Sequence, residues 1–429
     1  MLMCKYRNEI VEKINSLCLY GCEEIKCGDV LYYTIRMEEE HGIFQLIKQV
    51  IILLKSFLFD TNNYELCGDA NTLFFFGSSS ARRDMYSKFI KLKAAVHNRL
   101  YINPFGKYKI RRHTLRNIGS LRISLYWSTQ LKDILTNPVE RLRQINILYR
   151  AYCDYKSFLD YEKRNNLHIT KLVTLCDLQA TESYFTQMFN RDSKLTISLQ
   201  HGTYSSVDNP YEFRGIKSKI FLADGYFSKD EAKIAGISEK CKVIPVGLLT
   251  SIGVKKQERP DKYGNHTIGL ALEAESRRED NIKSIEFMAQ FCKNHNKRLV
   301  LRFHPTSPID NYKPILKKYG IVDYCSKEVS VKDFAKMIDI GITRYSTMLL
   351  DLLDLWIPTF LYVSEGQLQN TYKNYTMLNF SNERELSNLI ENINENTVSE
   401  LISNSRQYFI CAGDTLHNYQ EVLGQYGIS

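Results

Sequence analysis

Short apolar runs of strand length alternate with amphipathic stretches along much of the chain, and several of these runs stop abruptly at polar residues. The run at 299–303 leads directly into His304. The run at 195–199 leads, after one glutamine, into His201, and a third run at 338–343 precedes a group of hydroxyl residues. Apolar runs that alternate with helical patterns are typical of a parallel sheet covered by helices on both faces.

This alternation occurs twice, on either side of a polar stretch at 251–265 that has no hydrophobic period. With 429 residues, the chain is longer than a typical single domain. We therefore expect an α/β protein with an N-terminal Rossmann-like domain at 1–250 and a C-terminal one at 266–405, joined by 251–265. A helical segment at 406–429 should end the chain and cross back to the first domain.

The stretch at 43–59 is the most apolar part of the sequence. Its pattern predicts a helix. Lys48 and Lys55 interrupt the apolar run, and the run is short for a membrane-spanning helix. A buried helix is the expected structure, and a helix lying on a membrane surface is the alternative.

Composition places the chain among ordinary soluble globular proteins, with 44% hydrophobic and 24% charged residues. Its eleven cysteines are scattered, and no signal-peptide pattern opens the sequence, so we expect a cytoplasmic protein. Cys18, Cys22 and Cys27 form the densest group, but a zinc site would need a second pair of ligands. Free thiols are the expectation.

Positive charge is concentrated in one segment. Between Arg82 and Arg122 there are twelve Lys or Arg residues and one acid, so the rest of the chain is close to neutral although the net charge is +9. Such a segment should attract a polyanion or the anionic inner face of a membrane, unless it is only a solvated surface. Aromatic residues interleave with it, but no nucleic-acid-binding motif does, and we expect no nucleic acid. The candidate contacts are Arg82, Arg83, Arg111, Arg112 and Arg116.

In an open parallel sheet, ligands bind beyond the carboxyl ends of the strands. His304 follows such an end, and it is the strongest candidate for a contact to a phosphate, as a hydrogen-bond donor or a leaving-group acid. Ser346 and Thr347 precede a helical pattern, where free backbone N–H groups favour an anion, although simple helix capping would also explain them. Arg302 and Arg344 could neutralise the same phosphate or form structural ion pairs.

His201 follows the other strand and precedes a glycine, which suits an imidazole that projects into a cleft as a base or a phosphate contact. Asp177 at a strand end and Glu182 in the first turn of the next helix could cap that helix. Glu273 and Glu275 follow the strand at 267–272 and could bind ribose hydroxyls or the nucleotide base, or be solvated loop acids.

The order of these motifs resembles GT-B glycosyltransferases, which have two Rossmann-like domains and an active site in the cleft between them. The resemblance covers roughly residues 170 to 365 and is closest to CDP-glycerol glycerophosphotransferases, capsule Kdo transferases and bacterial polysialyltransferases. It rests on the segments at 200–203, 224–225, 243–247, 302–305, 339–343 and 346–347. The first 165 residues match no known pattern, and Ser346-Thr347 stands where relatives often have two serines.

The resemblance implies transfer of a sugar or a polyol phosphate from a nucleotide-activated donor, CMP- or CDP-linked, to a growing capsule, lipopolysaccharide or teichoic-acid-type acceptor. The acceptor would be an anionic or lipid-linked polysaccharide at the bacterial inner membrane. It further implies a metal-independent reaction without a cofactor, and a carboxylate base such as Asp177 or Glu182 by analogy with polysialyltransferases. A sugar-nucleotide 2-epimerase and a non-catalytic polyanion-binding protein remain the alternative functions.

Overall fold

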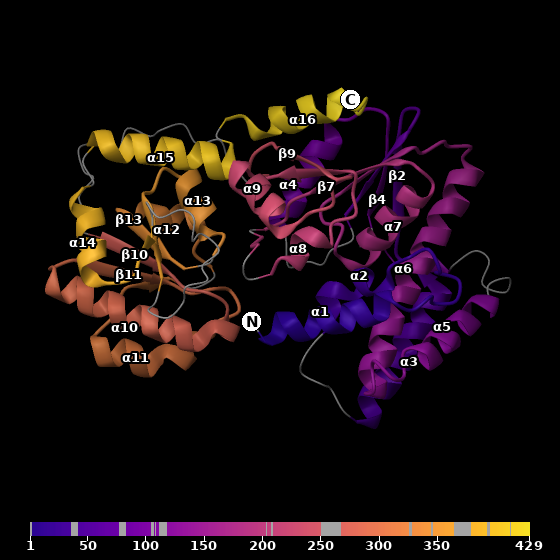
Figure 1. The fold of residues 1–429 in the computed structure, drawn as a ribbon, viewed down its shortest axis with the longest axis horizontal. Helices are drawn as coiled ribbons and strands as arrows, with labels where there is room; N and C mark the ends of the chain where they lie inside the picture. Colours follow the sequence, from indigo (N-terminus) through magenta and orange to yellow (C-terminus); the bar gives the residue numbers. More distant parts are fainter. Residues whose placement is uncertain are drawn as a thin grey trace. The chain divides into compact units, whose positions relative to one another are not determined.

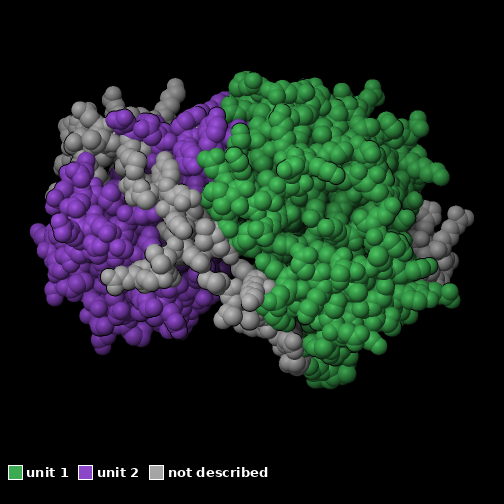
Figure 2. Space-filling view, in the orientation of Figure 1, with its two compact units in different colours: residues 1–223, 229–244, 416–429 green, residues 224–228, 245–415 purple. Residues whose placement is uncertain are grey.

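The computed structural model describes most of the chain, which divides into two compact units (Figure 2). Unit 1 consists of residues 1–223, 229–244 and 416–429, and unit 2 of residues 224–228 and 245–415. The described residues are 2–35, 42–76, 83–103, 107, 109–110, 118–202, 204–206, 209–249, 267–325, 328–344, 346–363, 379–392, 395–411 and 413–429.

Unit 1 is built on a sheet that, over the described residues, has seven strands in the order β2-β4-β3-β6-β7-β8-β9. The edge strand β2 is antiparallel to β4, whereas the pairings from β4 through β8 are parallel. The strands are β2 (Asn63–Cys67), β3 (Thr72–Phe75), β4 (Arg99–Asn103), β6 (Lys171–Thr174), β7 (Leu195–Leu199), β8 (Ile220–Ala223) and β9 (Lys242–Pro245). Most central strand residues are buried, as expected for parallel strands covered on both faces.

Helices account for most of the rest of unit 1. Asn137 starts the longest of them, because its side chain accepts hydrogen bonds from the N–H groups of Val139 and Glu140 and Pro138 occupies the first turn. The helices are α1 (Leu2–Asn15), α2 (Cys27–Leu31), α3 (Ile43–Leu58), α4 (Arg83–Ala94), α5 (Ile118–Gln130), α6 (Pro138–Arg164), α7 (Ala180–Arg191), α8 (Tyr211–Arg214) and α9 (Tyr226–Ala235).

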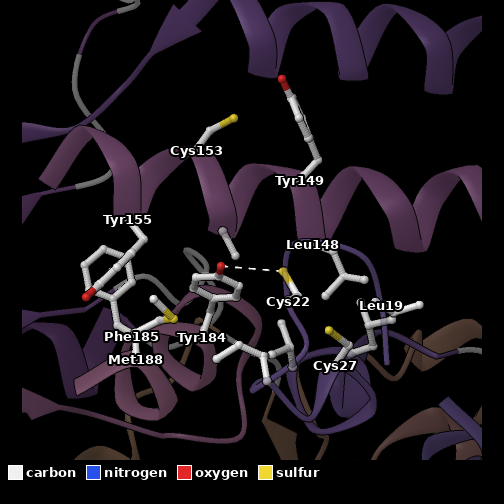
Figure 3. Packing of buried hydrophobic residues seen from close by; sticks show 14 of the residues in the cluster. Leu19, Cys22, Cys27, Leu148, Tyr149, Cys153, Tyr155, Tyr184, Phe185 and Met188 are labelled. Atoms are coloured by element: carbon white, nitrogen blue, oxygen red, sulfur yellow. Dashed lines mark hydrogen bonds between the residues drawn. The ribbon is translucent and has the colours of Figure 1, made fainter. Parts of the chain in front are cut away.

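The core of unit 1 joins these helices to the sheet. Phe185 stacks on Phe75 with ring centroids 4.7 Å apart, and Tyr155 meets Phe185 edge to face. Cys22 lies in the same cluster, with its Sγ 3.7 Å from the hydroxyl of Tyr184 (Figure 3). The cysteines with described side chains are free thiols, as the sequence predicts.

Unit 2 contains, among its described residues, a six-stranded sheet in the order β12-β11-β10-β13-β14-β15, and all its pairings are parallel. The strands are β10 (Thr267–Ala271), β11 (Arg298–Arg302), β12 (Tyr324–Cys325), β13 (Ile340–Thr343), β14 (Thr359–Tyr362) and β15 (Asn379–Phe380). The helices are α10 (Arg278–Asn294), α11 (Lys313–Tyr319), α12 (Val331–Lys336), α13 (Met348–Asp354), α14 (Glu383–Glu391) and α15 (Glu395–Ile410). The two parallel-sheet α/β units confirm the predicted fold class.

The C-terminal residues form two helices, because α15 ends at Ile410 and α16 (Thr415–Gln425) follows it. The segment after α16 is bound to unit 1: the N–H of His97 donates to the carbonyl oxygen of Ser429 at 3.1 Å, and Lys171 Nζ donates to that of Gly427 at 2.6 Å. The expected helix over 406–429 is thus divided in two, and residues 416–429 belong to unit 1. The linker at 251–265 lies outside the described residues.

The strands β2 and β4 were not expected from the sequence, in which the residues of β4 look like part of the basic segment. The helix predicted over 43–59 is present as α3, but its predicted burial is wrong. Its outward face is apolar and exposed, with Phe44 85% accessible, whereas the polar Gln49 is buried. Within the described part of the chain, no helix is both long enough and apolar enough to cross a membrane.

Gly225, between β8 and α9, is a position where a larger residue should not fit. A Cβ at this position would collide with the backbone carbonyl group of Phe409 in α15. We expect Gly225→Ala to lower the free energy of unfolding by about 1–3 kcal/mol, measured by denaturant titration. Gly424→Ala is the control, because nothing lies within 4 Å of a Cβ there. In the helix α16, this alanine should be neutral or stabilising, and an equal loss in both variants would contradict the assignment.

Candidate active site

The carboxyl ends of β10, β11 and β13 lie side by side at one edge of the unit 2 sheet. Ala271 is opposite Arg302 across one pairing, and Leu270 is opposite Ile342 across the other. The strands β11 and β12 follow on one side of β10, whereas β13, β14 and β15 follow on its other side, so the strand order reverses between β10 and β13. Such a reversal opens the crevice in which α/β sheets bind ligands. His304, Glu273 and Ser346 all follow strands that end at this edge.

His304 is half-buried at this edge, and its contacts define its tautomer. The backbone N–H of Thr306 donates to its Nδ1 at 3.2 Å, and the Thr306 hydroxyl lies 2.8 Å from the same atom. Because Nδ1 accepts the backbone N–H, the proton of the neutral ring is on Nε2. Burial lowers the pKa of His304 below its ordinary value of 6.5. Near neutral pH, this histidine is therefore an uncharged donor through Nε2–H.

The two arginines proposed for the phosphate have contacts within the unit. Arg302 donates to the carbonyl oxygen of Val329 at 2.6 Å, and its guanidinium lies over the ring of Phe334. Arg344 is 2% exposed, donates to the carbonyl oxygen of Asp280 at 3.1 Å and lies 3.5 Å from the carboxylate of the same residue. These contacts fit the structural alternative for both arginines. Burial also lowers the pKa of Arg302.

Glu275 joins the loop after β10 to the loop after β11. Its Oε1 accepts a hydrogen bond from Asn311 at 2.8 Å, and its Oε2 accepts one from the Tyr312 hydroxyl at 3.1 Å. Glu273 is 8% exposed, and its backbone is bound to the side chain of Asn281 on both sides. The Glu275 side chain therefore links the two loops at the carboxyl edge of the sheet. Glu273 is held through its backbone groups.

Ser346 and Thr347 begin α13. The hydroxyl of Ser346 accepts from the N–H of Met348 at 3.2 Å, and the carbonyl oxygen of Thr347 accepts from the N–H groups of Leu350 and Asp351. The Ser346 side chain thus binds the first N–H group of α13, as the capping alternative proposes, whereas the N-cap residue Thr347 makes no side-chain cap hydrogen bond. Both residues are half-buried at the same edge as His304.

In unit 1, His201 follows β7 at the carboxyl edge of the sheet. Its Nδ1 and the hydroxyl of Tyr204 are hydrogen-bonded at 2.5 Å, and Tyr204 also lies 3.7 Å from the sulfur of Cys176. Tyr33 packs edge-on against the imidazole, with ring centroids 5.7 Å apart, and donates to Glu212 at 3.0 Å. The two tyrosines hold the ring from two sides.

Burial, together with neighbouring acidic groups, raises the pKa of Tyr204 and of Tyr33 well above the ordinary tyrosine value. Both hydroxyls therefore keep their protons at neutral pH. The Tyr204 oxygen can donate to Nδ1 of His201 or accept from it, depending on the tautomer of the imidazole. When Nδ1–H donates to Tyr204, Nε2 is the unprotonated nitrogen of the neutral ring, the one at which an imidazole accepts a proton.

Asp177, an alternative base, is 1% exposed. Its Oδ2 accepts from the backbone N–H groups of Lys217 at 2.9 Å and Ser218 at 2.7 Å, so it fixes the chain that enters β8. Burial raises the pKa of Asp177 in spite of these hydrogen bonds. Glu182 is also 1% exposed, in the first turn of α7. Neither carboxylate is at the surface, so His201 is the better candidate for the base.

The basic segment is only partly described. Arg82, Arg111, Arg112 and Arg116 lie outside the described residues, and Arg83 begins α4. Among the described side chains, no group of three or more His, Cys, Asp or Glu residues could hold a metal ion. The metal-independent reaction stays a prediction.

Tyr204, Tyr33 and Thr306 are the site residues that sequence reasoning missed. Two of them have a local signal, because Tyr204 follows His201 by three positions and Thr306 follows His304 by two. Tyr33 has none, because 168 positions of sequence separate it from His201.

No protein-family model matches the chain, and no curated protein is similar to it in sequence. Similar solved structures include one described as a UDP-N-acetylglucosamine 2-epimerase from Listeria monocytogenes, with 9% identity, 82% of this chain and 95% of that chain covered, and a TM-score of 0.49. The lipopolysaccharide outer core galactosyltransferase WaaB has 11% identity, 83% and 99% coverage and a TM-score of 0.46. A glycosyltransferase from Rickettsia africae ESF-5 has 13% identity, 84% and 98% coverage and a TM-score of 0.46. Likeness at this level assigns neither a reaction nor a substrate.

The tautomer and pKa of His304 are measurable by NMR. We expect a pKa below 6.5 and a proton on Nε2, and Thr306→Val should preserve this tautomer because it keeps the backbone N–H. Because the folded pKa is depressed, the folded state binds fewer protons, so His304 destabilises the protein increasingly as the pH falls from 6.5 through the folded pKa. His304→Gln should remove that part of the pH dependence. A proton found on Nδ1 would contradict the assignment.

Proposed function

We propose that the protein is a glycosyltransferase that passes a sugar, or a polyol phosphate, from a nucleotide-activated donor to a growing bacterial surface polysaccharide without a metal ion. One observation carries the proposal. Each α/β unit has a histidine at the carboxyl edge of its sheet, and a neighbouring residue binds Nδ1 of each ring. For His304, this places the proton of the neutral ring on Nε2, where it can be donated to a substrate.

Unit 2 would bind the donor. His304 presents a neutral Nε2–H, which can donate to the phosphate oxygen that leaves with the nucleotide. Thr347 and the backbone at the start of α13 would add contacts to the same phosphate. The interactions of Arg302 and Arg344 support a structural role for both, so in this proposal His304 is the principal phosphate contact.

Unit 1 would supply the base. His201, in the tautomer with Nδ1–H bound to Tyr204, accepts the proton of the acceptor hydroxyl at Nε2. The acceptor oxygen then forms a bond to the transferred carbon, or to phosphorus in a polyol-phosphate transfer, while the bond to the nucleotide's phosphate oxygen breaks. His304 stabilises the negative charge on that departing oxygen.

The donor class and the acceptor rest on the resemblance and on charge. The families that share the motifs at 200–203 and 302–305 use cytidine nucleotides, which favours a CMP- or CDP-linked donor. The basic segment would hold an anionic polymer, or the inner leaflet that carries a lipid-linked acceptor. A sugar-nucleotide 2-epimerase is the second candidate. It would convert its donor without any acceptor.

Nucleotide binding tests the donor site directly. We expect the purified protein to bind CMP or CDP in preference to UMP, UDP and GDP without added metal, measured by calorimetry. His304→Ala should weaken binding by about tenfold or more, because a buried hydrogen bond to a charged group contributes roughly 1.5–3 kcal/mol. His201→Gln is the matched histidine variant and should bind the nucleotide as wild type does.

The outcomes separate the hypotheses. Tight binding of UDP or GDP would keep a transferase but overturn the cytidine donor, and donor conversion without acceptor would favour the epimerase. If none of the nucleotides binds, the donor site is wrong and a non-catalytic polyanion-binding protein becomes the better explanation.

The acceptor side is tested with the basic segment. Replacing Arg111, Arg112 and Arg116 by glutamine should weaken binding to dextran sulfate, used as a polyanion probe, and flatten its dependence on salt, because counterions released from the polyanion drive such binding. Cytidine-nucleotide binding should not change. Replacing Lys317, Lys318 and Lys336 of unit 2 by glutamine removes the same charge elsewhere and serves as the control. Unchanged binding of the arginine variant at low salt would refute the role of the segment.

A further inference from the structure

The outward face of α3 is an apolar surface on unit 1. Seven side chains make up this α3 stripe, and each is between 40 and 85% exposed: Ile43, Phe44, Ile47, Val50, Ile51, Leu54 and Leu58. At 3.6 residues per turn, they occupy roughly one third of the helix circumference. Single exposed apolar residues are ordinary on protein surfaces, but a continuous stripe of this kind marks an interaction site.

The inward face of α3 combines a buried polar residue with apolar residues. Gln49 is 5% exposed, and its side-chain and backbone oxygens both accept from Nδ2 of Asn146 in α6, each at 2.9 Å. Leu53 and Phe57 are only partly buried against the core. The helix lies along α6 (Figure 1) through these inward contacts, and the residues of the α3 stripe face away from the protein.

Positive charge accompanies the α3 stripe. The helix contains no acidic residue, and its two lysines, Lys48 and Lys55, are exposed along one border of the stripe. The next residues, β1 (Phe59–Asp60), pair with β5 (Lys109–Ile110) from the basic segment, with Phe59 opposite Ile110. The C-terminal end of α3 is thereby attached to the segment in which twelve Lys or Arg residues accompany one acid.

We propose that α3 is a membrane-binding helix that lies in the surface of an anionic lipid bilayer, with the α3 stripe among the acyl chains and Lys48 and Lys55 at the headgroups. Apolar side chains bordered by lysines, without an acidic residue, are the pattern of helices that bind anionic interfaces. A second copy of this chain would bring the same positive charges together, which disfavours a dimer through this face. The inference goes beyond the proposed transfer reaction and does not depend on its donor.

Vesicle flotation with the full-length protein tests this proposal. We expect binding to phosphatidylcholine vesicles that contain phosphatidylglycerol, and weaker binding to phosphatidylcholine alone. Ile47→Glu/Ile51→Glu places charge at the centre of the stripe and should weaken binding to both vesicles by more than about tenfold. Lys48→Gln/Lys55→Gln should cost about fivefold per lysine, only on the anionic vesicles and mainly at low salt.

Val322→Glu/Ile234→Glu is the matched control, because both residues are more than half exposed and lie outside α3. It should bind vesicles as wild type does. The melting temperature and the affinity for cytidine nucleotides should be the same in all these variants as in wild type. If the wild-type protein binds no cytidine nucleotide, the proposed donor site is wrong, but the vesicle test of α3 is unaffected. Vesicle binding that survives Ile47→Glu/Ile51→Glu would overturn the proposal. Light scattering gives a second test. The proposal would also be overturned if the wild-type protein is a dimer, and if Ile47→Glu/Ile51→Glu makes it a monomer that binds vesicles as strongly as wild type does.

Discussion

Parallel pairing of β10 with both β11 and β13 is the constraint on which unit 2 depends. Each parallel neighbour requires a crossover that returns the chain to the same edge, so the carboxyl ends of the central strands must gather there. Reversal of the strand order between β10 and β13 then leaves room between the loops that follow them. The loop with His304 and the start of α13 lie where they do because of this topology.

The loops at each edge fix their histidines through short local contacts. In unit 2, the backbone N–H of Thr306 in the turn after β11 donates to His304, and Asn311 and Tyr312 bind Glu275 and so join the neighbouring loops. In unit 1, a buried tyrosine that keeps its proton binds His201. Burial lowers the pKa of His304, and its backbone partner adds no charge, whereas a carboxylate partner would favour the imidazolium.

The sequence predicted the two α/β halves and both histidines, because buried parallel strands leave continuous apolar runs whose polar ends are easily seen. It could not assign the arginines. A strand-end arginine looks the same in sequence whether it meets a phosphate or, as Arg302 does, a carbonyl oxygen 27 positions away. The role of Asp177 could not be predicted either. Its partners are the backbone N–H groups of Lys217 and Ser218, and a sequence does not indicate which backbone groups a side chain will bind.

Helix α3 shows a different limit of sequence reasoning. The spacing of its apolar residues predicts that one face of the helix is apolar. The spacing does not predict whether that face packs against the core or is exposed on the protein surface. Hydrophobic burial normally decides this, and it would turn Ile47 and Ile51 toward α6. Here α6 places the amide of Asn146 against α3 instead, and Gln49 supplies the acceptors for its N–H group, which would otherwise be buried without a partner. The inward face of α3 therefore combines this amide pair with Leu53 and Phe57, and the wider apolar face is left for a partner outside the chain.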